Sequence, residues 1–176
     1  EGVNMSKFNM IMKNYPRYTE IASSNLLKEL FSGIEDWVLN ETNTCAIRVS
    51  AALNEAGVLI QRGVANKKHY IKGRGWKTHD KKYDYILRAT GMIEYLNKKY
   101  GRPVEEYIID IDDKLKYRRF RHQIENMSGI IALKSKTGSN FTGHVDIWNK
   151  GRFLGKDYFG ADWIDEIYFW TGSKIK

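Results

Sequence analysis

The order of periodic patterns along the chain is the feature that most limits its fold. Helical spacing of apolar residues is confined to residues 23–103, whereas strand-like runs are confined to residues 129–170. Helices followed by strands that are joined by short turns predict an antiparallel sheet packed against helices, which is the α+β class. The runs expected to form strands are GIIALK (129–134), HVDIW (144–148), RFLGKDYF (152–159) and EIYFW (166–170), with a tight turn at 149–151.

Three helices are expected ahead of these strands. Each combines apolar residues at spacings of three and four with a polar start or a glycine or proline stop. Their expected bounds are Ser23 or Ser24 to Gly33, Asn43 to Gly57, and Asp80 to Pro103. Residues 61–79 are expected to form an irregular basic loop, and the sequence pattern does not place residues 104–126.

The composition is typical of a globular chain. With 176 residues, 42% of them hydrophobic and only two prolines, the chain is long enough to bury a core, so we expect one domain over residues 1–176. Residues 1–4, ahead of Met5, are interpreted as a cloning scar. No apolar run reaches the length of a bilayer span, and the first residues lack the pattern of a signal peptide. The sequence therefore predicts no membrane insertion and no signal peptide.

The charge and the cysteine content narrow the possible partners and sites. The formal net charge of +8 and the pI of about 9.4 favour anionic partners, such as nucleic acid, an anionic membrane or bacterial cell wall. Cys45 is the only cysteine, so an internal disulfide and a Cys-rich zinc site are excluded. We expect no metal site.

Cys45 lies at the first turn of the helix that follows Asn43, directly after the polar pair Asn43-Thr44. A thiol at a helix N-terminus is close to the positive end of the helix dipole and to unpaired N–H groups, and both favour the nucleophilic thiolate. The same N–H groups are suited to hold the oxyanion of a tetrahedral intermediate. The alternative is a buried cysteine that serves as a small hydrophobe, which is the commoner role of a lone cysteine.

A cysteine nucleophile needs a base, and the base needs a group that orients it. His69, His79 and His122 lie in basic, polar stretches and are interpreted as surface residues, whereas His144 opens a strand. If the chain turns at residues 149–151, Asp157 returns opposite His144 on the next strand and is the preferred orienting group. Asp146, two residues after His144 and on the same side of its strand, is the alternative.

Three blocks of the sequence resemble the type VI secretion amidase effectors of family 4, which are small papain-like enzymes related to NlpC-type cell-wall peptidases. The blocks are NTCAIRVSAALNEAG (43–57), GIIALK (129–134) and TGHVDIWN (142–149), and the resemblance extends to about residue 170. It implies a papain-like fold in which Cys45 is the nucleophile and His144 the general base, oriented by an aspartate of the following strand. Asp157 and Asp146 both stay open for that third role.

The resemblance also implies a function. Such effectors cut the amide between D-glutamate and meso-diaminopimelate in peptidoglycan stem peptides, use no cofactor, and are injected by the secretion system into the periplasm of a neighbouring bacterium. An immunity protein in the periplasm of the producing cell is implied as a partner. Arg48 is a candidate to bind a substrate carboxylate, with a salt bridge inside the fold as the alternative. Trp76 is expected either to line the substrate site or to pack in the core.

Two other interpretations are compatible with parts of the sequence. A basic nucleic-acid-binding module would explain the net charge and the segment KYRRFRHQ (116–123), where aromatics interleave with arginines, but it leaves Cys45 and His144 unexplained. Another papain-like thiol hydrolase would use the same residues on a different peptide. We therefore expect an amidase that acts on peptidoglycan and binds no nucleic acid.

Overall fold

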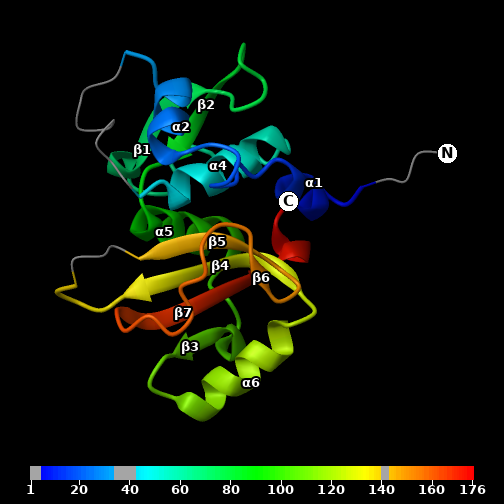
Figure 1. The fold of residues 1–176 in the computed structure, drawn as a ribbon, viewed down its shortest axis with the longest axis vertical. Coiled ribbons are helices and arrows are strands. Elements are labelled where there is room, and N and C mark those ends of the chain that lie inside the picture. The colour runs from blue at the N-terminus through cyan, green and yellow to red at the C-terminus, as the bar shows by residue number, and fades with distance from the viewer. Residues whose placement is uncertain (1–4, 34–42, 140–142) are drawn as a thin grey trace.

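The computed structural model describes residues 5–33, 43–139 and 143–176 (Figure 1). Its helices are α1 (Lys7–Lys13), α2 (Ser23–Leu30), α4 (Cys45–Glu55), α5 (Ala89–Tyr100) and α6 (Lys114–Ile124). Its strands are β1 (Tyr70–Arg74), β2 (Lys82–Ile86), β3 (Ile108–Asp110), β4 (Ser128–Ser135), β5 (His144–Asn149), β6 (Arg152–Phe153) and β7 (Ile164–Thr171). Short 3₁₀ turns lie at Lys67–His69, Glu105–Tyr107 and Gly172–Lys174. Residues 1–4, interpreted as a cloning scar, lie outside the described residues.

The strands form two antiparallel sheets. β1 and β2 make a hairpin in which Tyr70 pairs with Ile86, and the main sheet has the order β3-β7-β4-β5-β6. In the main sheet, β4 and β5 pair from Ser128–Asn149 to Leu133–His144. Because this register ends at His144, the histidine lies at one end of β5, next to the helical part of the molecule.

Helices cover both faces of the main sheet. Alternate residues of β4 point to opposite faces, so Ile130 and Ala132 pack with α4 and α5, whereas Ile131 and Leu133 pack with Phe120 of α6. Figure 1 shows α5 against one face of the sheet and α6 on the other side, with α2, α4 and the hairpin beyond α5. The side chains named here are almost fully buried, and burial of each isoleucine and leucine contributes about 1.5–3 kcal/mol to the free energy of unfolding.

α4 is buried on all sides, because residues 45–54 are all buried. Its polar side chains find partners within the protein. Ser50 Oγ donates to the carbonyl of Ala46 and accepts the N–H of Ile86. Asn54 Oδ1 accepts the N–H of Ile60, and Asn54 Nδ2 donates to the carbonyl of Asp84. These bonds fix α4 between the hairpin and β5, and they thereby fix the position of its first residue, Cys45.

The α+β class is confirmed, and so are the strands β4, β5 and β7 and the helix that begins after Asn43. The third helix begins at Ala89 and not near Asp80, because residues 82–86 form β2. The expected loop at 61–79 contains β1, and the unplaced region 104–126 contains β3 and α6. The N-cap of α2 is Ala22 and not a serine, and the expected strand 152–159 pairs only over its first two residues. None of the described helices is long and apolar enough to cross a bilayer.

Candidate active site

The start of α4 and the start of β5 are joined by Asn43. The backbone N–H of Cys45 donates to Asn43 Oδ1 at 3.3 Å, and Asn43 Nδ2 donates to the carbonyl of Gly143 at 3.3 Å. Cys45, the first residue of α4, has only 1% of its surface exposed. The thiol is therefore held at the N-terminus of α4 and beside the strand that begins with His144.

Gly143 allows His144 to reach this position. Its φ of +111° lies in the region that L side chains rarely adopt, and a Cβ added there would lie 2.6 Å from the carbonyl oxygen of Leu133, the partner of His144 across the sheet. A side chain at residue 143 would therefore push β5 away from β4. The glycine of the Gly-His pair is explained by this close approach.

Asp146 holds the imidazole of His144. The two residues lie two positions apart on β5, on the same side of the strand, and His144 Nε2 lies 2.7 Å from Asp146 Oδ2. The carboxylate also accepts the backbone N–H groups of Ile147 (2.7 Å), Gly155 (2.9 Å) and Lys156 (3.0 Å). Asp146 is fully buried, and these four bonds replace the water that a carboxylate loses on burial.

The surroundings favour the charged form of His144. Burial alone would lower the pKa of this imidazole, but the hydrogen bond with Asp146 and the hydrogen bond with the Cys45 side chain oppose it and raise the pKa to about 9, from an ordinary value of 6.5. Because Nε2 is taken by Asp146, the other ring nitrogen, Nδ1, is the one left for the thiol. The imidazole thus connects the thiol of Cys45 to the carboxylate of Asp146 through hydrogen bonds, which is the arrangement that activates a cysteine nucleophile.

The prediction that Asp157 orients His144 is wrong. Asp157 is exposed, and its Oδ1 accepts the N–H of Phe159 at 2.9 Å. The prediction assumed that the strand after the turn stays paired with β5, but β6 ends at Phe153 and the chain then leaves the sheet. The alternative, Asp146, lies in the expected place.

The prediction that Arg48 binds substrate is also wrong, since its guanidinium is fully buried and used inside the fold. Nε donates to Thr44 Oγ1, Nη1 to the carbonyl of Pro16, and Nη2 to the carbonyl of Ile21 and to Ser23 Oγ. The guanidinium carbon also lies 3.8 Å from the ring centre of Tyr18. Arg48 therefore ties residues 16–23 to the start of α4.

Trp76 packs in a cluster with Leu26, Leu27 and Phe31, separate from the cluster that contains Cys45. Its indole nitrogen is buried and has no partner among the described residues. These contacts favour the second of the two roles expected for Trp76, packing in the core.

Several neighbours of the site carried no recognisable signal in the sequence. The ring of Tyr158 meets the ring of His144 edge-on at 4.7 Å. The hydroxyl of Tyr15 lies near Asp146, and burial, together with the charge of Asp146, raises the pKa of Tyr15. A Cβ added at Gly155 would lie 2.5 Å from Asp146 Oδ2 and 2.6 Å from that hydroxyl. The stretch YPRY (15–18) shows no periodicity that would predict its position. Backbone N–H donors such as those of Gly155 and Lys156 cannot be predicted from residue type, because almost every residue has one.

No group of three or more His, Cys, Asp or Glu side chains within residues 5–33, 43–139 and 143–176 is arranged to hold a metal ion. What the site offers is a buried thiol at a helix N-terminus and a histidine whose partner is a carboxylate. A nucleophile and base of this kind suit the cleavage of an amide or ester through an acyl-enzyme.

Comparison with known proteins bears on this chemistry. Residues 41–170 match the family Tae4, described as type VI secretion system (T6SS), amidase effector protein 4. The chain belongs to this family. The match includes Cys45, His144 and Asp146, and it confirms the resemblance on which the expectation of an amidase effector rests. The Tae4 family is defined by amidase effectors, so the protein is classed as a hydrolase of the antibacterial effector type.

Solved Tae4 structures share the fold. The chain is 23% identical to Tae4 from Salmonella typhimurium bound to the immunity protein Tai4 from Enterobacter cloacae, with a TM-score of 0.67 over 93% of this chain and 97% of that one. It is 20% identical to Tae4 from Enterobacter cloacae in its Tae4–Tai4 complex, with a TM-score of 0.63 over 94% of each chain. Comparison with curated proteins finds no match.

Proposed function

We propose that this Tae4 family member is a single-domain cysteine amidase that hydrolyses the D-glutamyl–meso-diaminopimelate amide of peptidoglycan stem peptides. The observation that carries the proposal is the buried line of Cys45, His144 and Asp146, with the thiol at the N-terminus of α4. The choice of bond rests on the resemblance to the type VI amidase effectors. The net charge of +8 agrees with a substrate that bears several carboxylates.

Cys45, His144 and Asp146 each have a separate role in the proposed reaction. His144 Nδ1 takes the thiol proton, and the Cys45 sulfur attacks the carbonyl carbon that D-glutamate contributes to the amide. As the tetrahedral intermediate collapses, the imidazolium gives its proton to the diaminopimelate amine, which leaves, and a thioester remains. His144 then takes a proton from water while the water oxygen attacks the thioester carbon. The carbon–sulfur bond breaks, the Cys45 sulfur leaves as a thiolate, and the D-glutamate of the stem peptide keeps a free carboxylate. Asp146 holds the ring orientation and stabilises the imidazolium in both steps.

The biological setting follows from the family. We propose that type VI secretion delivers the protein to the periplasm of a target bacterium, where its substrate lies. The Salmonella typhimurium and Enterobacter cloacae relatives are solved as complexes with Tai4 immunity proteins. We therefore propose a cognate periplasmic immunity protein for this chain.

A digest of purified diaminopimelate-type peptidoglycan by the wild type and by Cys45→Ala, with the products identified by mass spectrometry, tests the proposal. The wild type should release a free amino group on diaminopimelate, and Cys45→Ala should release none. Thermal unfolding of both proteins serves as the control for folding. Cleavage by a folded Cys45→Ala protein would rule out the thiolate mechanism. Intact peptidoglycan after treatment with folded, reduced wild type would point to another peptide substrate.

A further inference from the structure

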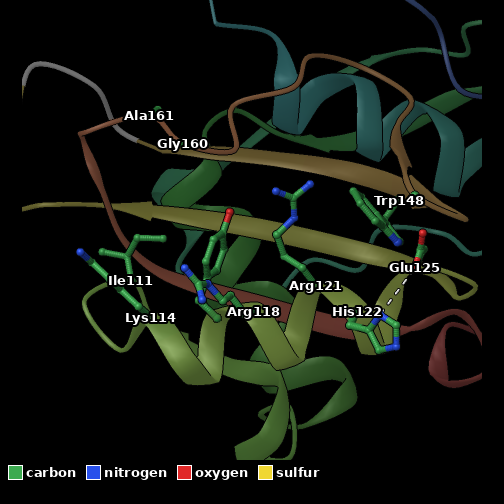
Figure 2. Close-up of a pocket in the computed structure, with 11 residues that line it drawn as sticks. Ile111, Lys114, Arg118, Arg121, His122, Glu125, Trp148, Gly160 and Ala161 are labelled. Carbon is green, nitrogen blue, oxygen red and sulfur yellow. Dashed lines mark ion pairs between the residues drawn. The ribbon is translucent and has the colours of Figure 1, made fainter.

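A groove of about 740 Å³ lies between α6 and the chain that follows β5, and neither Cys45 nor His144 lines it. Lys114, Arg118, Arg121 and His122 of α6 contribute cationic or titratable groups, and Gly160 and Ala161 form part of the opposite wall. Figure 2 shows Arg121 extending from α6 between Arg118 and Trp148. The arginines belong to the basic segment KYRRFRHQ, which the proposed reaction does not use.

Three positive charges of the groove are not neutralised by any residue that the structure describes. In the described part of the chain, no carboxylate forms an ion pair with Lys114, Arg118 or Arg121. The one carboxylate in the lining, Glu125, faces His122 at 3.8 Å. The positions 114, 118 and 121 lie on one face of the helix, so three cations project into the same volume. Such a volume attracts an anion with more than one negative group.

Arg121 is held in place before any ligand binds. Its guanidinium carbon lies 4.6 Å from the ring centre of Phe159, and that ring packs against Phe153 at 4.7 Å and Trp148 at 5.5 Å. Stacking fixes the plane of the guanidinium and leaves its N–H groups at the edge, which is the geometry that binds a carboxylate in a bidentate manner.

The aromatic residues of the groove do not suit nucleic acid. Single-stranded nucleic acid binds through bases stacked on exposed aromatic faces. Trp148 is 3% exposed and donates its indole N–H to the carbonyl of Ile124. Tyr117, which also lines the groove, is partly buried, and its ring meets the ring of Phe159 edge-on at 6.1 Å. Both of these aromatic side chains are therefore engaged within the protein, and the groove presents mainly cationic side chains to a ligand.

One loop connects the groove to the candidate active site. In this loop, the ring of Tyr158 contacts the ring of His144, and the ring of the next residue, Phe159, stacks with the guanidinium of Arg121. The two residues after that, Gly160 and Ala161, line the groove. A polymer held at Cys45 therefore lies close to the groove, and peptidoglycan carries a carboxylate-rich stem peptide at every repeat. We propose that the groove binds the carboxylates of a second stem peptide while the first is at Cys45. This inference rests on the proposed function.

Such a second site acts through effective concentration. Binding of one stem peptide brings the next one to the groove, so the affinity for the polymer exceeds that for an isolated stem peptide without any change at Cys45. The signature is therefore a loss of binding to intact sacculi without a loss of activity on a soluble single-peptide fragment.

The test compares two charge reversals at neighbouring positions of α6. Arg118→Glu lies in the groove, whereas Arg119→Glu makes the same change on a different face of the helix, outside it. In a Cys45→Ala background, co-sedimentation with diaminopimelate-type sacculi should show a Kd raised roughly tenfold by Arg118→Glu and more by Lys114→Glu/Arg118→Glu. Arg119→Glu should change it less than about twofold.

In the active background, all three variants should cleave a soluble disaccharide tetrapeptide at the wild-type rate. Equal sacculus binding by Arg118→Glu and Arg119→Glu would overturn the proposal, and so would a selective loss of binding to a single-stranded oligonucleotide with sacculus binding retained. Because sedimentation needs no cleavage, a failure of the proposed amidase activity would be seen separately in the wild-type digest.

Discussion

Two of the places where a histidine lies beside a carboxylate differ sharply in burial. At β5, His144 Nε2 and Asp146 Oδ2 are 2.7 Å apart, and the side chains are 2% and 0% exposed. Beside the β1–β2 hairpin, His69 Nε2 and Glu94 Oε2 are 3.2 Å apart, and the side chains are 17% and 32% exposed. Residue type and distance alone do not separate the two pairs.

The neighbours of each carboxylate separate them. Glu94 accepts hydrogen bonds from the backbone N–H of Asn66 and from the ammonium of Lys98, and all three groups lie at the surface. These hydrogen bonds lower the pKa of the Glu94 carboxyl. Asp146 has no water-exposed surface, its bonds are all internal, and a thiol lies on the far side of its histidine. Burial beside a nucleophile, and not the ion pair itself, marks the candidate catalytic pair.

The largest difference between the pairs is expected in catalysis. Asp146→Asn should lower kcat/KM by roughly 10²- to 10⁴-fold, because the amide no longer stabilises the imidazolium or fixes the ring. Glu94→Gln should leave kcat/KM within about twofold. Steady-state hydrolysis of a soluble stem-peptide substrate measures both. Equal losses in the two variants would mean that the buried pair has no special role.

The same contrast applies to the arginines of the two regions. Arg48→Met should lower the free energy of unfolding by roughly 2–4 kcal/mol, since it leaves the buried carbonyl of Pro16 and the partly buried carbonyl of Ile21 without this donor. Arg62, which pairs with Asp84 at 2.8 Å with its side chain 49% exposed, is the control. Arg62→Met should cost less than about 1 kcal/mol. Urea unfolding gives both values, and a small loss for Arg48→Met would contradict the network described for it.

A smaller effect should follow from crowding Asp146 without removing it. Gly155→Ala adds a methyl group 2.5 Å from Asp146 Oδ2, so the carboxylate must shift from His144 and kcat/KM should fall roughly tenfold. At Gly138, where φ is +82°, an added methyl meets no atom within 4 Å. Gly138→Ala should therefore lower stability through backbone strain and leave the activity of the folded enzyme unchanged. An unchanged rate for Gly155→Ala would show that Asp146 tolerates displacement.

The smallest effect is expected in the pH dependence of stability, where the two pairs act in opposite directions. Because the pKa of folded His144 is raised from 6.5 to about 9, its contribution is full below pH 6.5 and is lost as the pH rises toward 9. The pKa of Glu94 is lowered, so its contribution is present above its ordinary value of 4.5 and is lost as the pH falls below that value. Urea unfolding of wild type, His144→Gln and Glu94→Gln between pH 4 and pH 10 separates the two, and an alkaline slope that survives in His144→Gln would contradict the assignment.

The parts of the fold that the sequence predicted well are those with an unambiguous burial pattern. β4 and β7 contain the apolar runs 129–133 and 167–170, β5 alternates polar and apolar residues, and α4 has apolar residues on every side. α6 was missed because five of its eleven residues are Lys or Arg, and only Phe120 and Ile124 are buried. β2 was assigned to a helix because Tyr83 and Ile86 continue the spacing of the apolar residues in α5.

Within the site, the sequence identified the elements that carry their own signal, a lone cysteine after a polar pair and a histidine at the start of a strand. The third member was misplaced, since strand pairing was extended past the residue at which β6 ends. The residue at which a chain leaves a sheet is set by its backbone hydrogen bonds, and these cannot be predicted from residue type. Sequence alone could not choose between substrate binding and a role inside the fold for Arg48, because its acceptors, the carbonyls of Pro16 and Ile21, lie far away in the sequence.

The carboxylate of Asp146 has one more consequence, for the border of the main sheet. After Leu154 donates to the carbonyl of Ile147, the ladder between β5 and the returning chain would continue through the N–H group of Lys156, while the N–H group of Gly155 would face the open border. Both donate to Asp146 instead. An open row of donors at a sheet border invites the strand of another molecule to add to it. The side chain that aligns the histidine thus also closes this border against intermolecular β-pairing.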